Sequence, residues 1–190
     1  MKNGRYILDK RVVYYVDDQL HRIDGPVVIR EDGSEEWYHF GLFHRIDGPA
    51  VISIGNNKSW YINGQLHRVG NPAIIYDNGS REYYINGVPH REDGPAIETV
   101  SGLKKWFIHG KLHRENSLPA IKNPDGSKEW YEYGLRHRIN GPAVEKFNGI
   151  QEWWYLGQQF FTKEDFQKAV LYDKFLSSYP PKHTQKVKKI

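Results

Sequence analysis

Hydrophobic and aromatic side chains in this chain gather in short runs, and polar turn residues separate one run from the next. Examples are PAIIY (72–76), REYYI (81–85) and KEWYE (128–132). Runs of this length, rich in Ile, Tyr and Trp, are typical of β-strands. The pattern therefore predicts short strands joined by tight turns through most of the chain.

Two turn signals alternate between these runs. The first comprises Asp32-Gly33, Asn78-Gly79, Ser101-Gly102, Asp125-Gly126 and Asn148-Gly149, with Gly55-Asn56-Asn57 as a variant. The second comprises Phe40-Gly41, Asn63-Gly64, Asn86-Gly87, His109-Gly110, Tyr133-Gly134 and Leu156-Gly157. Pairs such as Asn-Gly and Asp-Gly suit the positive φ angles of hairpin turns. Two turns and two strands in each unit predict β-hairpins in series.

The units repeat with a period of 23 residues. A His-Arg pair begins at His21, His44, His67, His90, His113 and His137, and a proline follows each pair at Pro26, Pro49, Pro72, Pro95, Pro119 and Pro142. One step is a residue longer because Ser117-Leu118 replaces the usual Gly in HRENSLPA. A fixed period in this range is typical of a repeat array. A motif that recurs in every unit favours a structural role over a catalytic one.

A two-residue turn at Asn63-Gly64 predicts the register within each hairpin. Trp60 then faces His67, and Tyr61 faces Leu66. The same count opposes Glu36 to Arg45 and packs each repeated histidine on a cross-strand aromatic ring. Because neighbouring residues point to opposite faces of a strand, each aromatic pair places one ring on either side of the sheet. We expect one of these faces to remain partly open as an aromatic strip.

The predicted fold is mainly β: an elongated, single-layer antiparallel array of β-hairpins with a C-terminal capping α-helix. The predicted boundaries are residues 1–160 for the array, 161–179 for the helix and 180–190 for a basic tail. Tyr6 to Leu8 form a half-repeat at the first edge. At the other end Thr162 and Asp165 suggest a capping box, and Phe161 with Phe166 suggests a hydrophobic staple. Phe166, Ala169, Val170 and Leu176 form the predicted apolar stripe of this helix.

Charge is concentrated at one end of the chain. The net charge is +4, but residues 1–181 hold 23 basic and 23 acidic side chains, and the excess lies in PKHTQKVKKI (181–190). We expect this tail to be solvated, so nucleic acid is a partner only if the tail supplies it. The chain has no Cys, no apolar leader at its N-terminus and no apolar stretch of membrane-spanning length. These features predict a soluble, cytoplasmic protein without a membrane contact.

No catalytic constellation is recognisable, and neither a metal nor a cofactor is expected. Equivalent histidines of successive hairpins lie about 9–10 Å apart, which is too far to share one metal ion. The candidate binding residues are Trp37, Trp60, Tyr83, Trp106 and Trp130 on the aromatic strip, and Arg45, Arg68, Arg91, Arg114 and Arg138 in an arginine ladder. A large open aromatic strip favours a protein partner. Two alternatives remain open: a nucleotide held by Trp stacking and Arg–phosphate pairing, and self-association through the N-terminal edge at Arg5 to Leu8.

A 23-residue hairpin repeat with the pattern WYxNGxLHR resembles the MORN repeat, and more closely its bacterial antitoxin-type variant. The stretches Gly64–His67, Gly87–His90 and Gly110–His113 carry the likeness, which spans residues 5–157. MORN repeats place Gly directly after this His, where the present chain has Arg. The form HRxDGPA looks like arrays in proteins of tailed phages and giant viruses, which often close as Trp154–Phe166 does here. The resemblance implies a hairpin array and a viral, non-enzymatic protein that engages a host factor.

Overall fold

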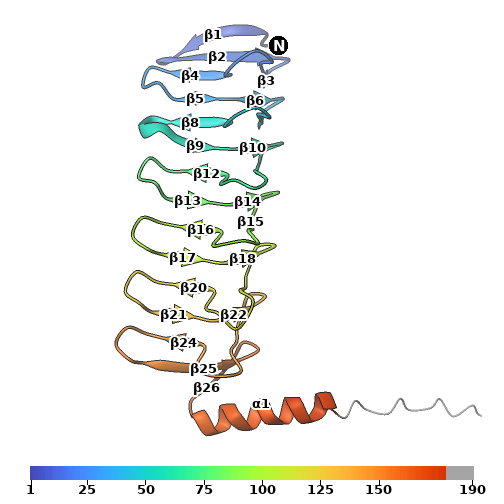
Figure 1. The fold of residues 1–190 in the computed structure, drawn as a ribbon. Helices are drawn as coiled ribbons and strands as arrows, with labels where there is room; N and C mark the ends of the chain where they lie inside the picture. Colours follow the sequence, from blue (N-terminus) through green and yellow to red (C-terminus); the bar gives the residue numbers. More distant parts are fainter. Residues whose placement is uncertain (179–190) are drawn as a thin grey trace, which may run out of the picture.

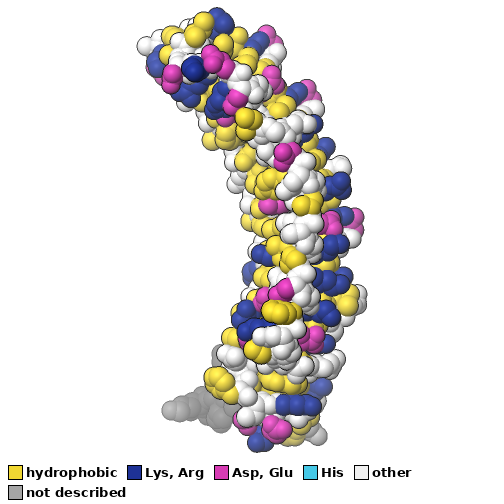
Figure 2. Space-filling model, turned by 90° about the vertical axis from the view of Figure 1, so that its left-hand side faces the viewer, with side chains coloured by type: hydrophobic (Ala, Val, Ile, Leu, Met, Phe, Trp, Pro, Cys, Tyr) yellow, Lys and Arg dark blue, Asp and Glu magenta, His cyan; other side chains and the backbone are white. Residues whose placement is uncertain are grey.

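A computed structural model describes residues 1–178 as an elongated stack of β-hairpins that ends in one helix (Figure 1). The array is curved along its length (Figure 2). The main sheet contains β1 (Gly4–Leu8), β2 (Arg11–Val16), β3 (Gln19–Leu20), β4 (Val28–Arg30), β5 (Glu35–Glu36), β8 (Val51–Ser53), β9 (Asn57–Ser59), β12 (Ile74–Ile75), β13 (Arg81–Glu82), β16 (Ile97–Glu98), β17 (Lys104–Lys105), β20 (Ile121–Lys122), β21 (Lys128–Glu129), β24 (Val144–Glu145), β25 (Gln151–Tyr155) and β26 (Gln158–Phe160). These 16 strands pair antiparallel, which confirms the predicted hairpin array.

A second column of hairpins runs beside the main sheet, so the chain does not form one continuous meander. Its pairs are β6 (Tyr38–His39) with β7 (Leu42–Phe43), β10 (Tyr61–Ile62) with β11 (Gln65–Leu66), β14 (Tyr84–Ile85) with β15 (Val88–Pro89), β18 (Phe107–Ile108) with β19 (Lys111–Leu112), and β22 (Tyr131–Glu132) with β23 (Leu135–Arg136). Each repeat therefore has a long arm in the main sheet and a short arm in the second column. A single 3₁₀ turn, η1 (Ile54–Asn56), replaces the Asp-Gly turn in one repeat.

The predicted register holds inside the short hairpins. Tyr61 pairs with Leu66, and the His67 N–H donates to the Trp60 carbonyl at 3.0 Å. Beyond this point the strands separate, because the Trp60 N–H donates to the Ala73 carbonyl of the next repeat at 2.8 Å. The first aromatic residue of each pair is thus the point where the chain passes from one column to the other.

Hydrogen bonds join each repeat to its neighbours in both columns. In the second column the Gly64 N–H, in the hairpin turn, donates to the Phe43 carbonyl of the preceding repeat at 2.8 Å. Equivalent bonds begin at Gly41, Gly87, Gly110, Gly134 and Gly157. Contacts of this nearest-neighbour kind are typical of repeat architectures.

The interior of the array is thin. Val27 and the alanines that follow the repeated prolines, Ala50, Ala73, Ala96, Ala120 and Ala143, are fully buried, and Val27 is the largest side chain among them. Polar pairs fill part of the remaining space. The Tyr84 hydroxyl donates to the Glu82 carboxylate at 2.9 Å, and burial raises the pKa of this tyrosine. The corner between the two columns therefore holds hydrogen-bonded Glu–Tyr pairs as well as small apolar residues.

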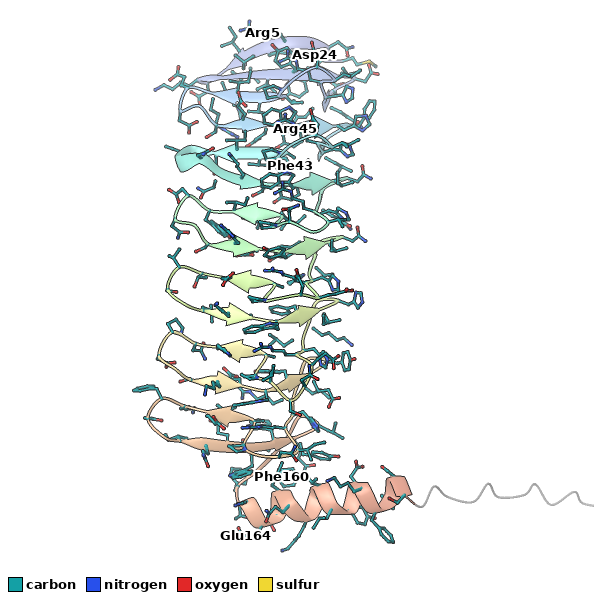
Figure 3. All side chains as sticks on the ribbon, viewed as in Figure 1. Arg5, Asp24, Phe43, Arg45, Phe160 and Glu164 are labelled. Carbon is teal, nitrogen blue, oxygen red and sulfur yellow. The ribbon has the colours of Figure 1, made fainter. Side chains whose placement is uncertain are left out.

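Helix α1 (Lys163–Ser178) lies across the end of the array next to β26 (Figures 1 and 3). The capping pair is confirmed, since the Asp165 N–H donates to the Thr162 hydroxyl at 3.1 Å. The predicted staple is wrong: Phe161 is 92% exposed, and Phe166, which is 2% exposed, packs instead against Trp153 and Phe160. Phe160 takes the place of Phe161 because strand alternation directs every second side chain toward the helix.

The predicted stripe of α1 is only partly correct. Val170 is buried beside Phe166, whereas Leu176 is largely exposed. Leu176 lies on a different side of α1 from Phe166 and Val170, because it is not three or four residues from either of them along the helix. This helix is not long and apolar enough to cross a membrane. The basic tail predicted at 180–190 lies outside the described residues.

Candidate binding surface

Each repeated arginine lies flat on an aromatic ring of its own hairpin. The distance from the guanidinium carbon to the ring centroid is 4.1 Å for Arg45 on Trp37 and 3.8 Å for Arg114 on Trp106. The other stacks are Arg22 on Tyr14, Arg68 on Trp60, Arg91 on Tyr83 and Arg138 on Trp130. The ten predicted binding residues are therefore brought together as five internal pairs, held by cation–π attraction.

In four of the six repeats a Gly-Pro pair lies against the arginine, and Asn71-Pro72 and Leu118-Pro119 take its place in the other two. The Arg45 guanidinium donates to the Pro49 carbonyl at 3.4 Å. A Cβ atom added at Gly48 would lie only 2.7 Å from the guanidinium carbon of Arg45, so the guanidinium would have to shift to admit a larger residue. The same close approach occurs at Gly25, Gly94 and Gly141. The HRxDGP motif is thus explained by the packing of one side chain.

The aromatic strip, which was expected to be partly open, is covered to a large extent. The five rings are half-buried or buried, and Trp130, at 5% exposed, donates its indole N–H to the Ser117 carbonyl at 2.9 Å. The arginine covers one face of each ring, so a nucleotide base cannot stack on that face while the arginine stays in place. The predicted opposition of Glu36 and Arg45 is also wrong, because the strands separate after Trp37 and Glu36 pairs with Arg30 at 2.6 Å instead.

Acidic residues form ion pairs with some of the repeated arginines but not with all of them. Arg22, Arg45 and Arg91 pair with Asp24, Asp47 and Asp93 at 2.8, 2.9 and 2.7 Å. Hydrogen bonding from these arginines lowers the pKa of each carboxylate. Arg138 pairs with Glu145 at 2.6 Å.

Arg68 and Arg114 form no ion pair with any residue in the described range 1–178. In the loop of Arg68, Gly70 stands where three other repeats have Asp, and the loop of Arg114 is one residue longer, with Ser117-Leu118 in place of the usual Gly. Burial lowers the pKa of both guanidinium groups. Their Nη1 atoms donate to the carbonyls of Pro72 and Pro119.

The repeated histidines join successive repeats. The Nδ1 atom of His44 accepts the Asn63 N–H at 3.1 Å, and the same bond recurs in every repeat. Some of the turn residues that donate are aromatic and have positive φ, such as Tyr133, whose ring stacks on His113 at 4.1 Å. The expected packing of histidine on a cross-strand Trp is therefore wrong, since the ring reaches the next repeat. Within residues 1–178 no three His, Asp or Glu side chains are grouped as metal ligands.

Three highly exposed apolar side chains of the array lie in the loop after the His-Arg pair. Ile23, Ile46 and Val69 are 93%, 85% and 74% exposed and occupy the same position in three consecutive repeats. We call these three residues the aliphatic ridge. A cleft of about 780 Å³ separates the loops of Ile23 and Ile46, with Trp37 and Tyr38 in its lining.

The sequence contained the signal for this ridge. The residue after the His-Arg pair is aliphatic in the first three repeats, although a loop position exposed to water is usually polar, as it is at Glu92 and Glu115. The prediction chose the aromatic residues because they are the larger hydrophobic side chains. In the structure, the neighbouring arginine covers one face of each of these aromatic rings.

The chain matches no protein-family profile, and a comparison with curated proteins found none that is similar.

Proposed function

We propose that this protein is a non-enzymatic scaffold that recognises another protein through the loop side of its hairpin array. The observation that carries the proposal is the aliphatic ridge of Ile23, Ile46 and Val69. Exposed apolar side chains that recur in line are typical of interaction sites, because water contact with them is unfavourable. The resemblance to MORN-type arrays, including those of phages and giant viruses, supports the same class of function.

The spacing of the ridge limits the partner that fits it. Equivalent residues of successive hairpins lie about 9–10 Å apart, since two strand spacings separate them. A partner helix repeats a side chain over this distance about every seven residues, because the rise is about 1.5 Å per residue. We expect the partner to present apolar side chains at this interval, in the manner of a helix laid along a groove.

The experiment is affinity capture with three forms of the full-length chain: the natural protein, an Ile23→Ser/Ile46→Ser/Val69→Ser variant, and an Ile54→Ser/Val100→Ser control. The control residues are exposed apolar side chains in the turns of the main-sheet hairpins, where Ile54 begins η1 and Val100 lies between β16 and β17. A partner should bind the natural protein and the control and be lost from the ridge variant. The purified partner should then form a stoichiometric complex that shows the same dependence.

If every captured protein binds the ridge variant as well as the natural protein, recognition through the ridge is wrong. Mass spectrometry of small molecules in the same eluate tests the nucleotide alternative. A nucleotide that co-purifies with all three forms, in the absence of a protein partner, would replace the proposal.

A further inference from the structure

The outer face of the main sheet carries a row of charged residues that lie directly opposite one another. Its order along the array is Arg81, Glu98, Lys104, Lys122, Lys128 and Glu145. The middle of this row consists of three lysines on consecutive paired strands β17, β20 and β21. They point to the same face, because directly opposite residues of an antiparallel sheet share a face.

Like charges in this arrangement repel each other. Side chains directly opposite on paired strands are neighbours, and like charges there are destabilising. Lys104 is compensated by Glu98 at 2.9 Å, but Lys122 and Lys128 are exposed and form no ion pair within residues 1–178. The neighbouring Glu145 is engaged by Arg138. The row therefore contains positive charge that the described part of the chain does not neutralise.

An arginine stack extends this positive region. The Lys122 ammonium lies 5.9 Å from the centroid of the Trp106 ring, and the Arg114 guanidinium lies 3.8 Å from the same centroid. Arg114 is one of the two repeated arginines without a carboxylate partner. We call Lys104, Lys122, Lys128 and Arg114 the basic patch.

We propose that the basic patch binds an acidic segment of a partner protein. The inference rests on the proposed protein-binding function and adds a second contact surface to it, with different residues. An extended acidic segment presents carboxylates on one face about every 6.6–6.8 Å. Two or three such carboxylates therefore fit along the basic patch.

The dimensions of the patch favour a short acidic segment over a nucleic acid. Three strands span only about 10 Å, and Glu98 and Glu145 border the lysines on both sides. A phosphate backbone laid along the row would meet these carboxylates. Single-stranded nucleic acids are typically held by aromatic rings that stack on the bases, and here Arg114 covers a face of Trp106.

The test measures binding of a fluorescent peptide of alternating glutamate and threonine to the full-length protein. A glutamine–threonine peptide is the uncharged control. The variant is Lys122→Glu/Lys128→Glu, and the matched control is Lys111→Glu/Lys174→Glu, which changes the net charge equally at exposed lysines outside the patch. Both proteins retain residues 181–190, so a difference between them does not come from the basic tail.

We expect the natural protein and the Lys111/Lys174 control to bind the glutamate peptide and to lose it as salt is raised. The Lys122/Lys128 variant should bind about tenfold more weakly, since two attractive contacts become repulsive. Equal binding by the two variants, or no preference for glutamate over glutamine, overturns the inference. So does binding of oligothymidylate in place of the peptide with the same dependence on Lys122 and Lys128.

The Ile23→Ser/Ile46→Ser/Val69→Ser variant separates the two proposals. It should still bind the glutamate peptide, because the ridge and the patch share no residue. If the patch test fails while partner capture still depends on the ridge, the proposed function stands without this second surface.

Discussion

Arg45 illustrates how one side chain determines most of the repeat motif. Its guanidinium stacks on Trp37, donates to the Pro49 carbonyl and pairs with Asp47, while Gly48 leaves room for it. The contact with each partner is modest, since exposed ion pairs contribute little and a cation–π contact at an exposed site contributes about 0.5–1 kcal/mol. Together they hold the loop after the His-Arg pair in one conformation, and the exposed ridge residue Ile46 is part of that loop.

The close approach of Gly48 to Arg45 leads to a first prediction. A Gly48→Ala substitution should destabilise the protein by about 1 kcal/mol, the low end of the cost of overpacking, because the added methyl group overlaps the guanidinium and forces this flexible end of Arg45 to move. Chemical denaturation measures the change in the free energy of unfolding. In an Arg45→Ala background the same substitution should cost much less, since the obstructing group is gone. An equal loss of stability in both backgrounds would show that the contact between Gly48 and the Arg45 guanidinium does not limit the residue at position 48.

The histidine bonds between repeats make stability depend on pH. His137 Nδ1 accepts the Leu156 N–H, and His21 Nδ1 accepts the Phe40 N–H, so both rings must be unprotonated at that atom. Burial lowers the pKa of both histidines below the ordinary value of 6.5. The folded state therefore favours the neutral ring more strongly than the unfolded state does.

We expect the free energy of unfolding to be highest above about pH 6.5 and to fall as the pH decreases through the lowered pKa values of the folded state. Stability decreases toward low pH because the unfolded chain binds protons at these histidines more readily than the folded chain does. Denaturation curves between about pH 8 and about pH 5 measure the effect. A His137→Asn variant should show a smaller decrease over this interval. A stability that does not change with pH would contradict the assignment.

At the scale of elements, the contact between α1 and the array is small within residues 1–178, where Phe166 and Val170 are the buried side chains of the helix. Phe166 and Val170 face the last hairpin, and the Tyr155 hydroxyl donates to Asp173 at 2.6 Å. This contact and burial raise the pKa of Tyr155 to about 12. Because the buried side of α1 is small, the docking depends strongly on Phe166.

Two phenylalanines near α1 provide a matched test of this docking. Phe166→Ala should cost about 3–5 kcal/mol, which is the usual loss for a buried phenylalanine. Phe161→Ala should change stability little, since that side chain is in water. Hydrogen exchange of the α1 amides should rise in the first variant and not in the second. Similar effects of both substitutions would mean that the helix packs differently.

The sequence was sufficient for the hairpins because their signals are local. The Asn63-Gly64 turn and the alternation around it fix the pairing of Tyr61 with Leu66 within a few residues. The change of column at Trp60 was not predictable in the same way, since it depends on the Ala73 carbonyl of the next repeat. The covering of Trp37 by Arg45 likewise follows from a loop conformation that strand alternation does not describe.

At the scale of the whole molecule, the two ends of the main sheet differ. Helix α1 lies at one end, whereas β1 forms the other with a free edge (Figure 1). The turn at Asp9 and Lys10, both at positive φ, makes Leu8 and Arg11 a hydrogen-bonded pair. By alternation the backbone groups of Arg5 and Ile7 point outward, away from β2. This edge can pair with a second copy, and the helix at the other end limits such pairing to a dimer.

An Ile7→Pro variant tests the edge, because proline removes the outward N–H while leaving the bonds between β1 and β2. We expect the natural protein to dimerise as its concentration rises and the variant to remain monomeric in sedimentation velocity. Ile7→Ser retains the N–H and should still dimerise, which separates the backbone bond from the loss of the apolar side chain. A natural protein that stays monomeric at every concentration would show that the free edge is not used.

The placement of β1 and α1 at opposite ends also determines how the array would respond to tension. Hydrogen bonds between strands run along the long axis, so a pull between the two ends loads them one after another and not all at once. Each 23-residue repeat that opens would release roughly 80 Å of chain, given about 3.4 Å per extended residue. The repeats would therefore unfold one after another at low force, and the array would lengthen in equal steps. It would unfold before it transmitted a large force.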